Sequence, residues 1–355
     1  MSAYAREQPL VRPAGSYCYT EELAMAQLNL VSYPGKEFPR ELCRFIADWH
    51  AESEFIVAHT SGSTGAPKEI CLLKSDMRVS ARATNTFFGI NTDSVIGMAL
   101  SAEYIAGKMM AVRAIESGAT LCPLPVSNEI DLTETPPLDL LAIVPSQMNN
   151  FAEHPEFVSK VRNLLVGGAA PDAGLCNRLA LLGYKVFISY GMTETCSHVA
   201  LAAGADPYRI FHAVEGISFD VTDDHRLVIE CPKFSFRRLV TNDVVELISK
   251  YDFKWRGRAD GVINSGGLKF YPEELEAMYS LVLGDLIYYV CGVSDEKWGT
   301  AVALVFEGDE TLSVSIKAAL ESVIADRRRL PHHYIAVAAL PRTANGKIRR
   351  NGHLL

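Results

Sequence analysis

Short apolar runs alternate with segments of helical periodicity over roughly residues 54 to 190 of the chain. The apolar runs lie at 55–60, 94–100, 140–146, 161–168 and 184–191. Helix-period segments lie between them at 75–87, 109–116 and 172–182, and Gly118 is placed to end the second helix. Strands that alternate with helices form βαβ units, so this part of the chain predicts an α/β domain.

The pattern changes after about residue 205. Strand-like segments with turns, at 226–232 and 239–249, predict a β-rich subdomain or edge attached to the first unit. A further unit begins after Gly266, with Pro272 as its first helical residue. A helix over 273–282, strands around 290–295 and 300–308, and a helix from about 315 to 328 follow. We therefore expect a large α/β domain and then a small α+β domain.

Charge and cysteine content exclude several classes of protein. The 34 basic and 42 acidic residues give a net charge of -8, which disfavours a nucleic-acid partner. A short basic cluster at 327–329 is expected to be a solvated helix end. The 8 cysteines show no CxxC spacing, so we expect reduced thiols in a cytoplasmic protein and neither zinc nor disulfides. No apolar run is long enough to predict a membrane span.

A Ser/Thr/Gly-rich segment at 59–68 lies between two apolar runs. Glycines let the backbone approach a ligand, while backbone N–H groups, hydroxyls and a lysine can surround phosphate oxygens. It is not a Walker A loop, because no Gly-Lys-Ser/Thr closes it. A plain loop is the alternative interpretation. The candidate phosphate-binding residues are Thr60, Ser61, Gly62, Ser63, Thr64, Gly65 and Lys68.

A second candidate segment ends the apolar run at 184–191, where open α/β sheets present ligands. Tyr190 could stack on a base, Thr193 could bond a phosphate and Glu194 could hold Mg²⁺ through oxygen. An aromatic side chain packed at a strand end is the alternative. The segment consists of Tyr190, Gly191, Met192, Thr193 and Glu194.

These two segments resemble the phosphate loop and the YGMTE motif of the adenylate-forming superfamily, which includes acyl-CoA synthetases, luciferases and peptide-synthetase adenylation domains. The resemblance implies an adenine pocket at Gly167, Gly168 and Ala169, and an aspartate for the ribose hydroxyls at Asp243. The glycine usual before that aspartate is here Asn242.

The C-terminal third resembles the same superfamily. The segments 255–260 and 265–276 resemble its hinge motif, which implies Asp260 as the hinge residue. Residues 341–347 resemble the loop with the catalytic lysine, here Lys347. The resemblance further implies binding roles for Arg258, Gly266, Gly267 and Lys269. Taken singly, Asp243 could cap a turn, the two glycines could form a hairpin tip and Lys347 could be a solvated lysine, but the motifs follow the family order.

The resemblance implies a mechanism and its cofactors. The enzyme would join a carboxylic acid to AMP from ATP and pass the acyl group to coenzyme A. Mg²⁺ would be held by Glu194 and Thr64, and Lys347, with Thr193 and Glu194, would stabilise charge at the α-phosphate. Rotation of a mobile domain about Asp260 would expose the acyl group to the thiol. The domains would then be 1–259 and 260–355.

The phosphate loop begins near residue 60, earlier than is usual in the family, so most of an N-terminal subdomain is expected to be missing. This compact length and the segment 144–147 resemble the o-succinylbenzoate-CoA ligases of menaquinone synthesis. Lys108 and Arg113 could bind a second carboxylate of such an acid, although a surface or snorkelling role is the alternative for both. The pocket candidates are Tyr104, Lys108, Ser146, Ser197 and His198.

Two other functions stay open at this stage. A stand-alone adenylation enzyme could load the thiol of a separate carrier protein, since no carrier domain follows Lys347. A degenerate nucleotide-binding protein would follow if the missing region had removed the active surface. Otherwise the partners expected are ATP, coenzyme A and a small carboxylic acid, and the sequence leaves the oligomeric state open.

Overall fold

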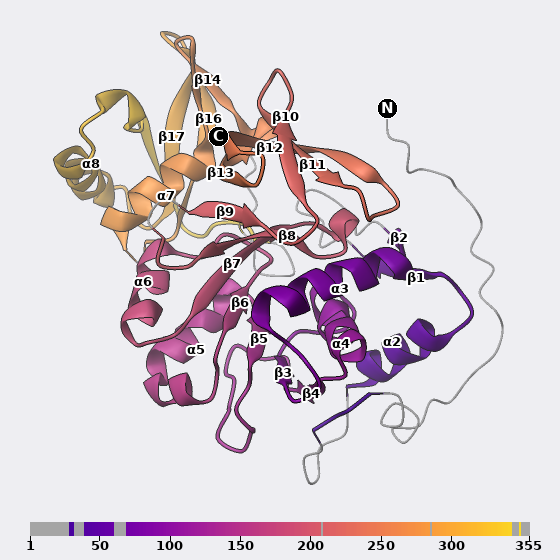
Figure 1. Cartoon of the computed structure of the whole chain (residues 1–355). Coiled ribbons are helices and arrows are strands. Elements are labelled where there is room, and N and C mark those ends of the chain that lie inside the picture. The colour runs from indigo at the N-terminus through magenta and orange to yellow at the C-terminus, as the bar shows by residue number, and fades with distance from the viewer. Residues whose placement is uncertain are drawn as a thin grey trace.

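The computed structural model describes residues 28–31, 39–59, 69–206, 209–284, 286–342 and 348. An 11-stranded sheet runs through the larger part of the molecule, in the order β10-β11-β12-β13-β9-β8-β7-β6-β5-β3-β4 (Figure 1). Its strands are β3 (Val95–Met98), β4 (Thr120–Pro123), β5 (Leu140–Ile143), β6 (Leu164–Val166), β7 (Val186–Gly191), β8 (His198–Ala203), β9 (Ile210–Ala213), β10 (Ser218–Val221), β11 (Arg226–Cys231), β12 (Arg237–Ser249) and β13 (Asp252–Arg258).

One half of this sheet is parallel and the other half antiparallel. β4, β3, β5, β6 and β7 pair in parallel, whereas β8 and the strands beyond it pair antiparallel. β5 and β6 are buried along their whole length, as expected for parallel strands covered on both faces. The β-rich region predicted after residue 205 is therefore an extension of the same sheet.

Helices accompany the parallel half of the sheet (Figure 1). Their bounds are α2 (Arg40–His50), α3 (Lys74–Phe88), α4 (Ile105–Ser117), α5 (Met148–Glu153) and α6 (Ala173–Leu181). α4 ends as predicted at Gly118, whose φ of 72° is left-handed. α6 begins after Asp172, whose side chain accepts a hydrogen bond from the Leu175 N–H at 2.7 Å. The α/β fold class predicted from the alternating pattern is confirmed.

The first strand of the predicted alternation does not join the parallel sheet. β1 (Phe55–His59) pairs antiparallel with β2 (Glu69–Leu73) in a separate two-stranded sheet. In β1 only Ile56 and Ala58 are buried, while Phe55 is exposed. A strand buried on one face fits a hairpin better than the interior of a parallel sheet.

A second hydrophobic core lies beyond the sheet, around α7, α8 and three strands. It gathers buried residues from Ile263 to Leu330, while the first core extends from Leu28 to Phe253. The elements here are β14 (Ile263–Ser265), β15 (Leu268–Phe270), α7 (Pro272–Leu283), β16 (Tyr288–Asp295), β17 (Gly299–Glu307), α8 (Leu312–Val323) and β18 (His333–Val337). α7 begins at Pro272 as predicted. A domain boundary at residues 259 and 260 stays a prediction.

The helix predicted over 315–328 ends earlier, at Val323. Ile324 after it is extended and buried, and Asp326 then caps a separate 3₁₀ turn, η5 (Arg327–Arg329). Arg329 pairs with Glu274 of α7 at 3.1 Å. The expectation that all three arginines form a solvated helix end was therefore wrong, because Arg329 belongs to a contact with a neighbouring helix.

The sequence predicted no membrane span and no disulfides, and the structure addresses both predictions only for the residues that it describes. Among them, no helix combines the length and apolarity that crossing a membrane requires. No disulfide joins the seven cysteines in the same part of the chain.

Candidate functional site

The two candidate segments that follow strands lie side by side at one edge of the sheet. β6 and β7 are parallel neighbours with Val166 opposite Ile188, so the chain leaves both strands at the same end. Gly167 is held by its N–H, which donates to the Ile143 carbonyl at 3.0 Å. A Cβ on Gly167 would lie 2.7 Å from Oγ of Ser189. Glycine therefore keeps this edge open, with Gly168 and Ala169 exposed beyond it.

Tyr190 at the end of β7 contacts the aspartate expected to bind ribose. Its hydroxyl donates to Oδ2 of Asp243 at 2.7 Å, and Nε1 of Trp255 donates to Oδ1 at 3.2 Å. β7, β12 and β13 each supply one of these side chains. The fold thus brings together two of the predicted site residues and adds Trp255, the first residue of the segment that resembles the hinge motif.

Burial raises the pKa of Tyr190 well above its ordinary value, and the adjacent Asp243 carboxylate raises it further. The phenol therefore stays protonated and can donate to Asp243 at neutral pH. A carboxylate oxygen accepts more than one hydrogen bond, so Asp243 keeps acceptor capacity for a hydroxylated ligand.

The turn after Tyr190 is tightly packed. A Cβ on Gly191 would lie 2.2 Å from the carbonyl oxygen of Ser197, a distance that no side chain tolerates. Oγ1 of Thr195 accepts from the Met192 N–H at 3.0 Å and closes the turn. Thr193 and Glu194 lie on the 3₁₀ turn η3 (Thr193–Thr195), with Glu194 exposed.

Of the predicted magnesium ligands, only Glu194 lies among the described residues. No group of three or more His, Cys, Asp and Glu side chains that could hold a metal occurs in that part of the chain. A single exposed carboxylate suits Mg²⁺, which binds through few protein ligands together with phosphate oxygens. The chemistry of Glu194 therefore fits the predicted role, which stays a prediction.

The predicted hinge aspartate is held by neighbours on the sheet. Oδ1 and Oδ2 of Asp260 accept from Nε and Nη2 of Arg258 at 3.0 and 3.1 Å. These bonds lower the pKa of Asp260, and a hydrogen bond from the side chain of Asn242 contributes to the same shift. Asn242, where the family usually has glycine, therefore touches the residue expected to act as a hinge.

The glycines of the predicted hinge motif occupy a hairpin between β14 and β15. Gly266 and Gly267 have φ values of 54° and 81°. A Cβ on Gly266 would lie 2.6 Å from the ring of Trp298. Gly266 therefore packs on the partly exposed indole of Trp298, in contrast to Gly267, which has no neighbour within 4 Å of a Cβ position.

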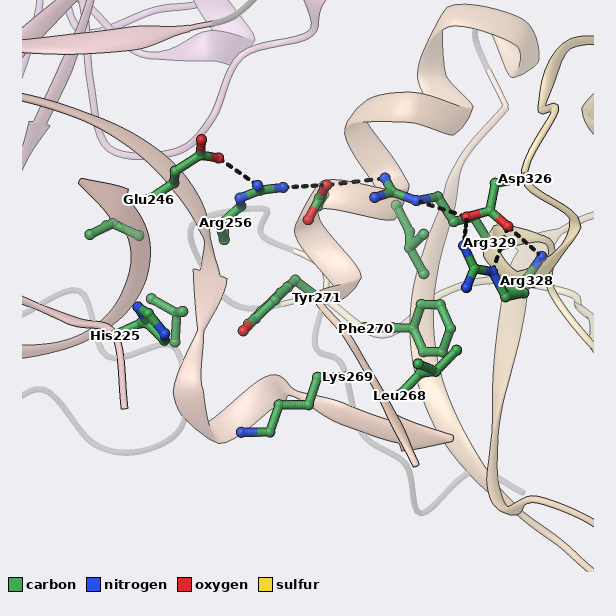
Figure 2. A pocket seen from close by; sticks show the side chains of 14 residues that line it. His225, Glu246, Arg256, Leu268, Lys269, Phe270, Tyr271, Asp326, Arg328 and Arg329 are labelled. Carbon is green, nitrogen blue, oxygen red and sulfur yellow. Dashed lines mark hydrogen bonds and ion pairs between the residues drawn. The ribbon is translucent and has the colours of Figure 1, made fainter. Parts of the chain in front are cut away.

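A cavity of about 440 Å³ lies where β12 and β13 face β15, α7 and η5 (Figure 2). Lys269 lines it, and Figure 2 shows its ammonium on the same side as the Tyr271 hydroxyl and His225. Three arginines also line this cavity, and each pairs with an acidic residue that lines it too. His225, which also lines the cavity, could not be predicted from the sequence, since no pattern marks a lone histidine at a turn.

Ser197 and His198 lie in a buried polar cluster. Nη2 of Arg113 on α4 donates to Oγ of Ser197 at 2.7 Å, and Nε2 of His198 lies 3.1 Å from Oγ1 of Thr84 on α3. Burial lowers the pKa of His198 well below its ordinary value, and the neighbouring Arg113 lowers it further. This histidine is therefore neutral near pH 7.

The surface role weighed for Arg113 was wrong. Its exposed fraction is 2%, and burial lowers the pKa of its guanidinium to about 9. Its partners are Ser197 and the Sδ of Met110, and its Nε has no hydrogen-bond partner among the described residues. Periodicity alone could not reveal this burial, because α4 is buried nearly all round.

The other pocket candidates make contacts of their own. Lys108 donates to the Ala102 carbonyl at 2.5 Å, and its ammonium lies 5.3 Å from the centre of the Phe45 ring. Ser146 donates to Asn128 at 2.9 Å, and Tyr104 is 41% exposed. Within the described part of the chain, no hydrogen bond links these three to Ser197 or His198. Their place in an acyl pocket stays a prediction.

The remaining predicted residues lie outside the described part of the chain. They are Thr60, Ser61, Gly62, Ser63, Thr64, Gly65, Lys68 and Lys347. The described residues that flank the first segment, His59 and Glu69, face each other in the β1–β2 pair. The roles expected for this segment and for Lys347 stay predictions.

Comparison with known proteins decides the family. The family of AMP-binding enzymes matches residues 23–229. The chain belongs to this family. Residues 167–169, Tyr190 and Glu194 all lie inside the matched region. The resemblance drawn from the motifs is thereby confirmed.

Individual relatives are more distant. The chain is 24% identical over 336 residues to 2-succinylbenzoate–CoA ligase of Listeria monocytogenes serotype 4b, covering 85% of this chain and 70% of that protein. Staphylococcus aureus has a protein of the same name that is 22% identical over 324 residues, covering 83% of this chain and 65% of its own length. This AMP-binding enzyme thus spans about two thirds of the length of these curated relatives.

Solved structures agree on the fold. An acyl-CoA synthetase (AMP-forming)/AMP-acid ligase II-like protein from Dyadobacter fermentans is 29% identical with a TM-score of 0.61, covering 93% of this chain and 96% of that one. The o-succinylbenzoate CoA synthetase of Bacillus subtilis in complex with its acyl-adenylate intermediate is 21% identical with a TM-score of 0.69, covering 83% and 68%. The first of these is matched over nearly its whole length.

Proposed function

We propose that this AMP-binding enzyme is an ATP-dependent carboxylic acid–CoA ligase that works through an acyl-adenylate. The observation that carries the proposal is the hydrogen bond between Tyr190 and Asp243. Tyr190 ends β7, the strand beside β6, and the segment 167–169 follows β6 at the same end of the sheet. Membership of the AMP-binding family supports a nucleotide at this edge. The names of the curated relatives support coenzyme A as the thiol that accepts the acyl group.

The chemistry of the site suits the AMP moiety. Asp243 already accepts one hydrogen bond on each oxygen, and the remaining lone pairs can accept from the two ribose hydroxyls. We assign the adenine to the segment 167–169, where Gly168 and Ala169 are exposed. Mg²⁺, bound through Glu194 and Thr64, would neutralise phosphate charge.

In the first step a carboxylate attacks the α-phosphorus of ATP, and pyrophosphate leaves. The acid is already ionised at neutral pH, so no general base is needed. Two anions must approach each other, and the chain's contribution is positioning and charge neutralisation. We assign the cation at the α-phosphate to Lys347 and the donors around the other phosphates to residues 60–68, with Thr193 as a further donor.

In the second step the thiol of coenzyme A attacks the acyl carbonyl, and AMP leaves. Lys347 would occupy the side from which the thiol must come, so the C-terminal part, from residue 260, has to turn between the steps. Asp260 would be the hinge. Gly266, Gly267 and Lys269 would then face the pantetheine arm, while Arg258 would stay near the nucleotide.

For the acid we propose o-succinylbenzoate, which would place the enzyme in menaquinone synthesis. The names of the curated relatives support this choice. The buried guanidinium of Arg113 also supports it, because an acid with a second carboxylate needs a cation at its far end. Ser197 and His198 beside Arg113 would then border the acyl group, and we expect the enzyme to act in the cytoplasm.

Pyrophosphate exchange into ATP with a panel of carboxylic acids tests this function. We expect exchange with an aromatic acid that carries a second carboxylate, and a thioester after addition of coenzyme A. Release only by a phosphopantetheinylated carrier protein would instead assign the carrier-loading function. Absence of exchange with every acid would contradict a ligase and favour a nucleotide-binding protein without catalysis.

A further inference from the structure

A chain of ion pairs crosses from the large sheet to the second hydrophobic core (Figure 2). Arg256 on β13 donates to Oε2 of Glu246 on β12 at 2.5 Å and to Oε1 of Glu274 on α7 at 2.7 Å. The same Glu274 oxygen accepts from Arg329 at 3.1 Å. The carboxylate of Glu274 is thus shared between an arginine of the sheet and an arginine of the second core.

Glu274 and Arg329 are fixed to the second core. Leu275, the residue after Glu274, is buried in that core, and so is Tyr279 one turn further along α7. The Tyr279 hydroxyl also donates to the backbone carbonyl of Arg329. If the second core rotated relative to the sheet, Glu274 and Arg329 would therefore move together, while Arg256 would stay with the sheet.

Arg256 is directed to Glu274 by a bulge in its strand. Val245 of β12 faces Trp255, and Val244 faces Gly257, so Arg256 between them has no opposite residue. A bulge redirects the side chain of the extra residue. As a result, Trp255 reaches Asp243 in the nucleotide site while its neighbour Arg256 reaches α7.

Arg256 and Glu274 have the exposure expected of a contact that can open. Their side chains are 28% and 22% exposed, so solvent weakens this ion pair less than it weakens a fully exposed pair. Water can still reach both charged groups when the pair breaks. Among the described residues, two ion pairs link the large sheet to the part of the chain that begins at Asp260. One is Arg256–Glu274, and the other joins the hinge neighbours Arg258 and Asp260.

We propose that Arg256 and Glu274 are positioning residues: their ion pair holds the second core in this orientation against the sheet and must open when that core turns about Asp260. The proposal rests on the proposed function, because it concerns the balance between the two half-reactions. The pair sets the proportion of molecules in this orientation, and with it the relative rates of acyl-adenylate formation and thioester formation.

The test uses Arg256→Gln, Glu274→Gln and the double variant of the full-length chain. Pyrophosphate exchange and thioester formation from a preformed acyl-adenylate are measured separately for each protein. We expect the ratio of the two rates to shift by about fivefold or more, in the same direction in both single variants. Since the residues act as one pair, the double variant should shift the ratio no further.

Arg238→Gln is the matched control. Arg238 pairs with Glu230 at 2.9 Å, but both residues belong to the sheet, so their bond does not join the two cores. This variant should leave the ratio within about twofold of the wild type, as for an exposed pair. Equal rate ratios in the wild type, Arg256→Gln and Glu274→Gln would overturn the proposal.

Small-angle X-ray scattering of the ligand-free proteins separates this proposal from the proposed function. If the wild type shows neither half-reaction, the ligase function fails, but the ion pair can still be judged. Arg256→Gln and Glu274→Gln should then broaden the distribution of intramolecular distances relative to the wild type and Arg238→Gln. Identical distributions in all four proteins would overturn the role of the pair.

Discussion

The hydroxyl of Tyr190 donates to Oδ2 of Asp243 at 2.7 Å, although 53 positions separate the two residues in the sequence. Trp255 holds the other oxygen of the same carboxylate. The aspartate is thus fixed before any ligand arrives, and a fixed acceptor would lose little entropy on binding the ribose hydroxyls that we propose for it.

Tyr190→Phe removes one of these two bonds. Near pH 8 we expect the free energy of unfolding to fall by about 1.5 to 3 kcal/mol, the range for a hydrogen bond to a charged group. We also expect weaker binding of ATP, since Asp243 loses one of the two hydrogen-bond donors that fix its carboxylate. Chemical denaturation and the KM for ATP measure the two effects.

The pH dependence of the same variant gives a second check. The pKa of Tyr190 is raised in the folded state, so its contribution is complete below the unfolded value near 10 and is lost as the pH rises beyond it. Wild type should therefore lose stability above pH 10 more steeply than Tyr190→Phe. Parallel stability curves for the two proteins would argue against a buried, protonated Tyr190.

His198 makes the protein sensitive to acid. Its pKa is lowered by burial and by Arg113, so the unfolded chain binds a proton at this position at a higher pH than the folded one. Stability should fall as the pH drops below about 6.5, by up to about 1.4 kcal/mol per pH unit for this one group. Denaturation of wild type and His198→Gln at pH 7.5 and 5.0 measures the difference.

His225→Asn is the control for this prediction, because His225 is exposed at a turn. The loss of stability between pH 7.5 and 5.0 should be smaller in His198→Gln than in wild type and in His225→Asn. An equal loss in all three proteins would show that His198 does not dominate the acid response.

Arg113→Met tests whether Arg113 binds a second carboxylate of the acid substrate. Because Arg113 is buried without a carboxylate partner among the described residues, we expect kcat/KM for an acid with a second carboxylate to fall by roughly thirtyfold or more. An acid of similar size without that group should be affected far less. Methionine should not reduce stability, since replacing a buried charge by an apolar side chain is often neutral or stabilising. Equal losses for both acids would refute the carboxylate contact.

Gly191→Ala tests the tight turn after Tyr190. The added methyl would lie 2.2 Å from the Ser197 carbonyl oxygen and 2.5 Å from Cα of His198, so the backbone would have to move. We expect a loss of about 3 kcal/mol in the free energy of unfolding. Gly267→Ala is the comparison. Its added methyl would lie more than 4 Å from any neighbouring atom, so the only cost is that of a non-glycine residue at a left-handed φ, about 1 to 2 kcal/mol. Equal costs would contradict the packing described for this turn.

The parallel half of the fold could be predicted because its signals are local. The fully apolar strand at Leu140–Ile143, the glycine that ends α4 and the proline that begins α7 each act through neighbouring residues. Pairing between distant segments leaves no such local signal. The β1–β2 hairpin and the early end of α8 depend on partners elsewhere, which the periodic pattern does not contain.

The candidate site shows the same division. The family order of the motifs predicted that Tyr190 and Asp243 would belong to one site, and the structure places them in contact. The burial of Arg113 could not be predicted, because an arginine in an apolar helix fits a snorkelling side chain equally well. Nor could the bulge at Arg256, which depends on the register of β12 and β13.

The two half-reactions of Lys347→Ala test the central claim most directly. Pyrophosphate exchange should fall by about a hundredfold or more relative to wild type, because the cation at the α-phosphate is lost. Thioester formation from a preformed acyl-adenylate and coenzyme A should continue at nearly the wild-type rate. Equal loss of both half-reactions would contradict the account.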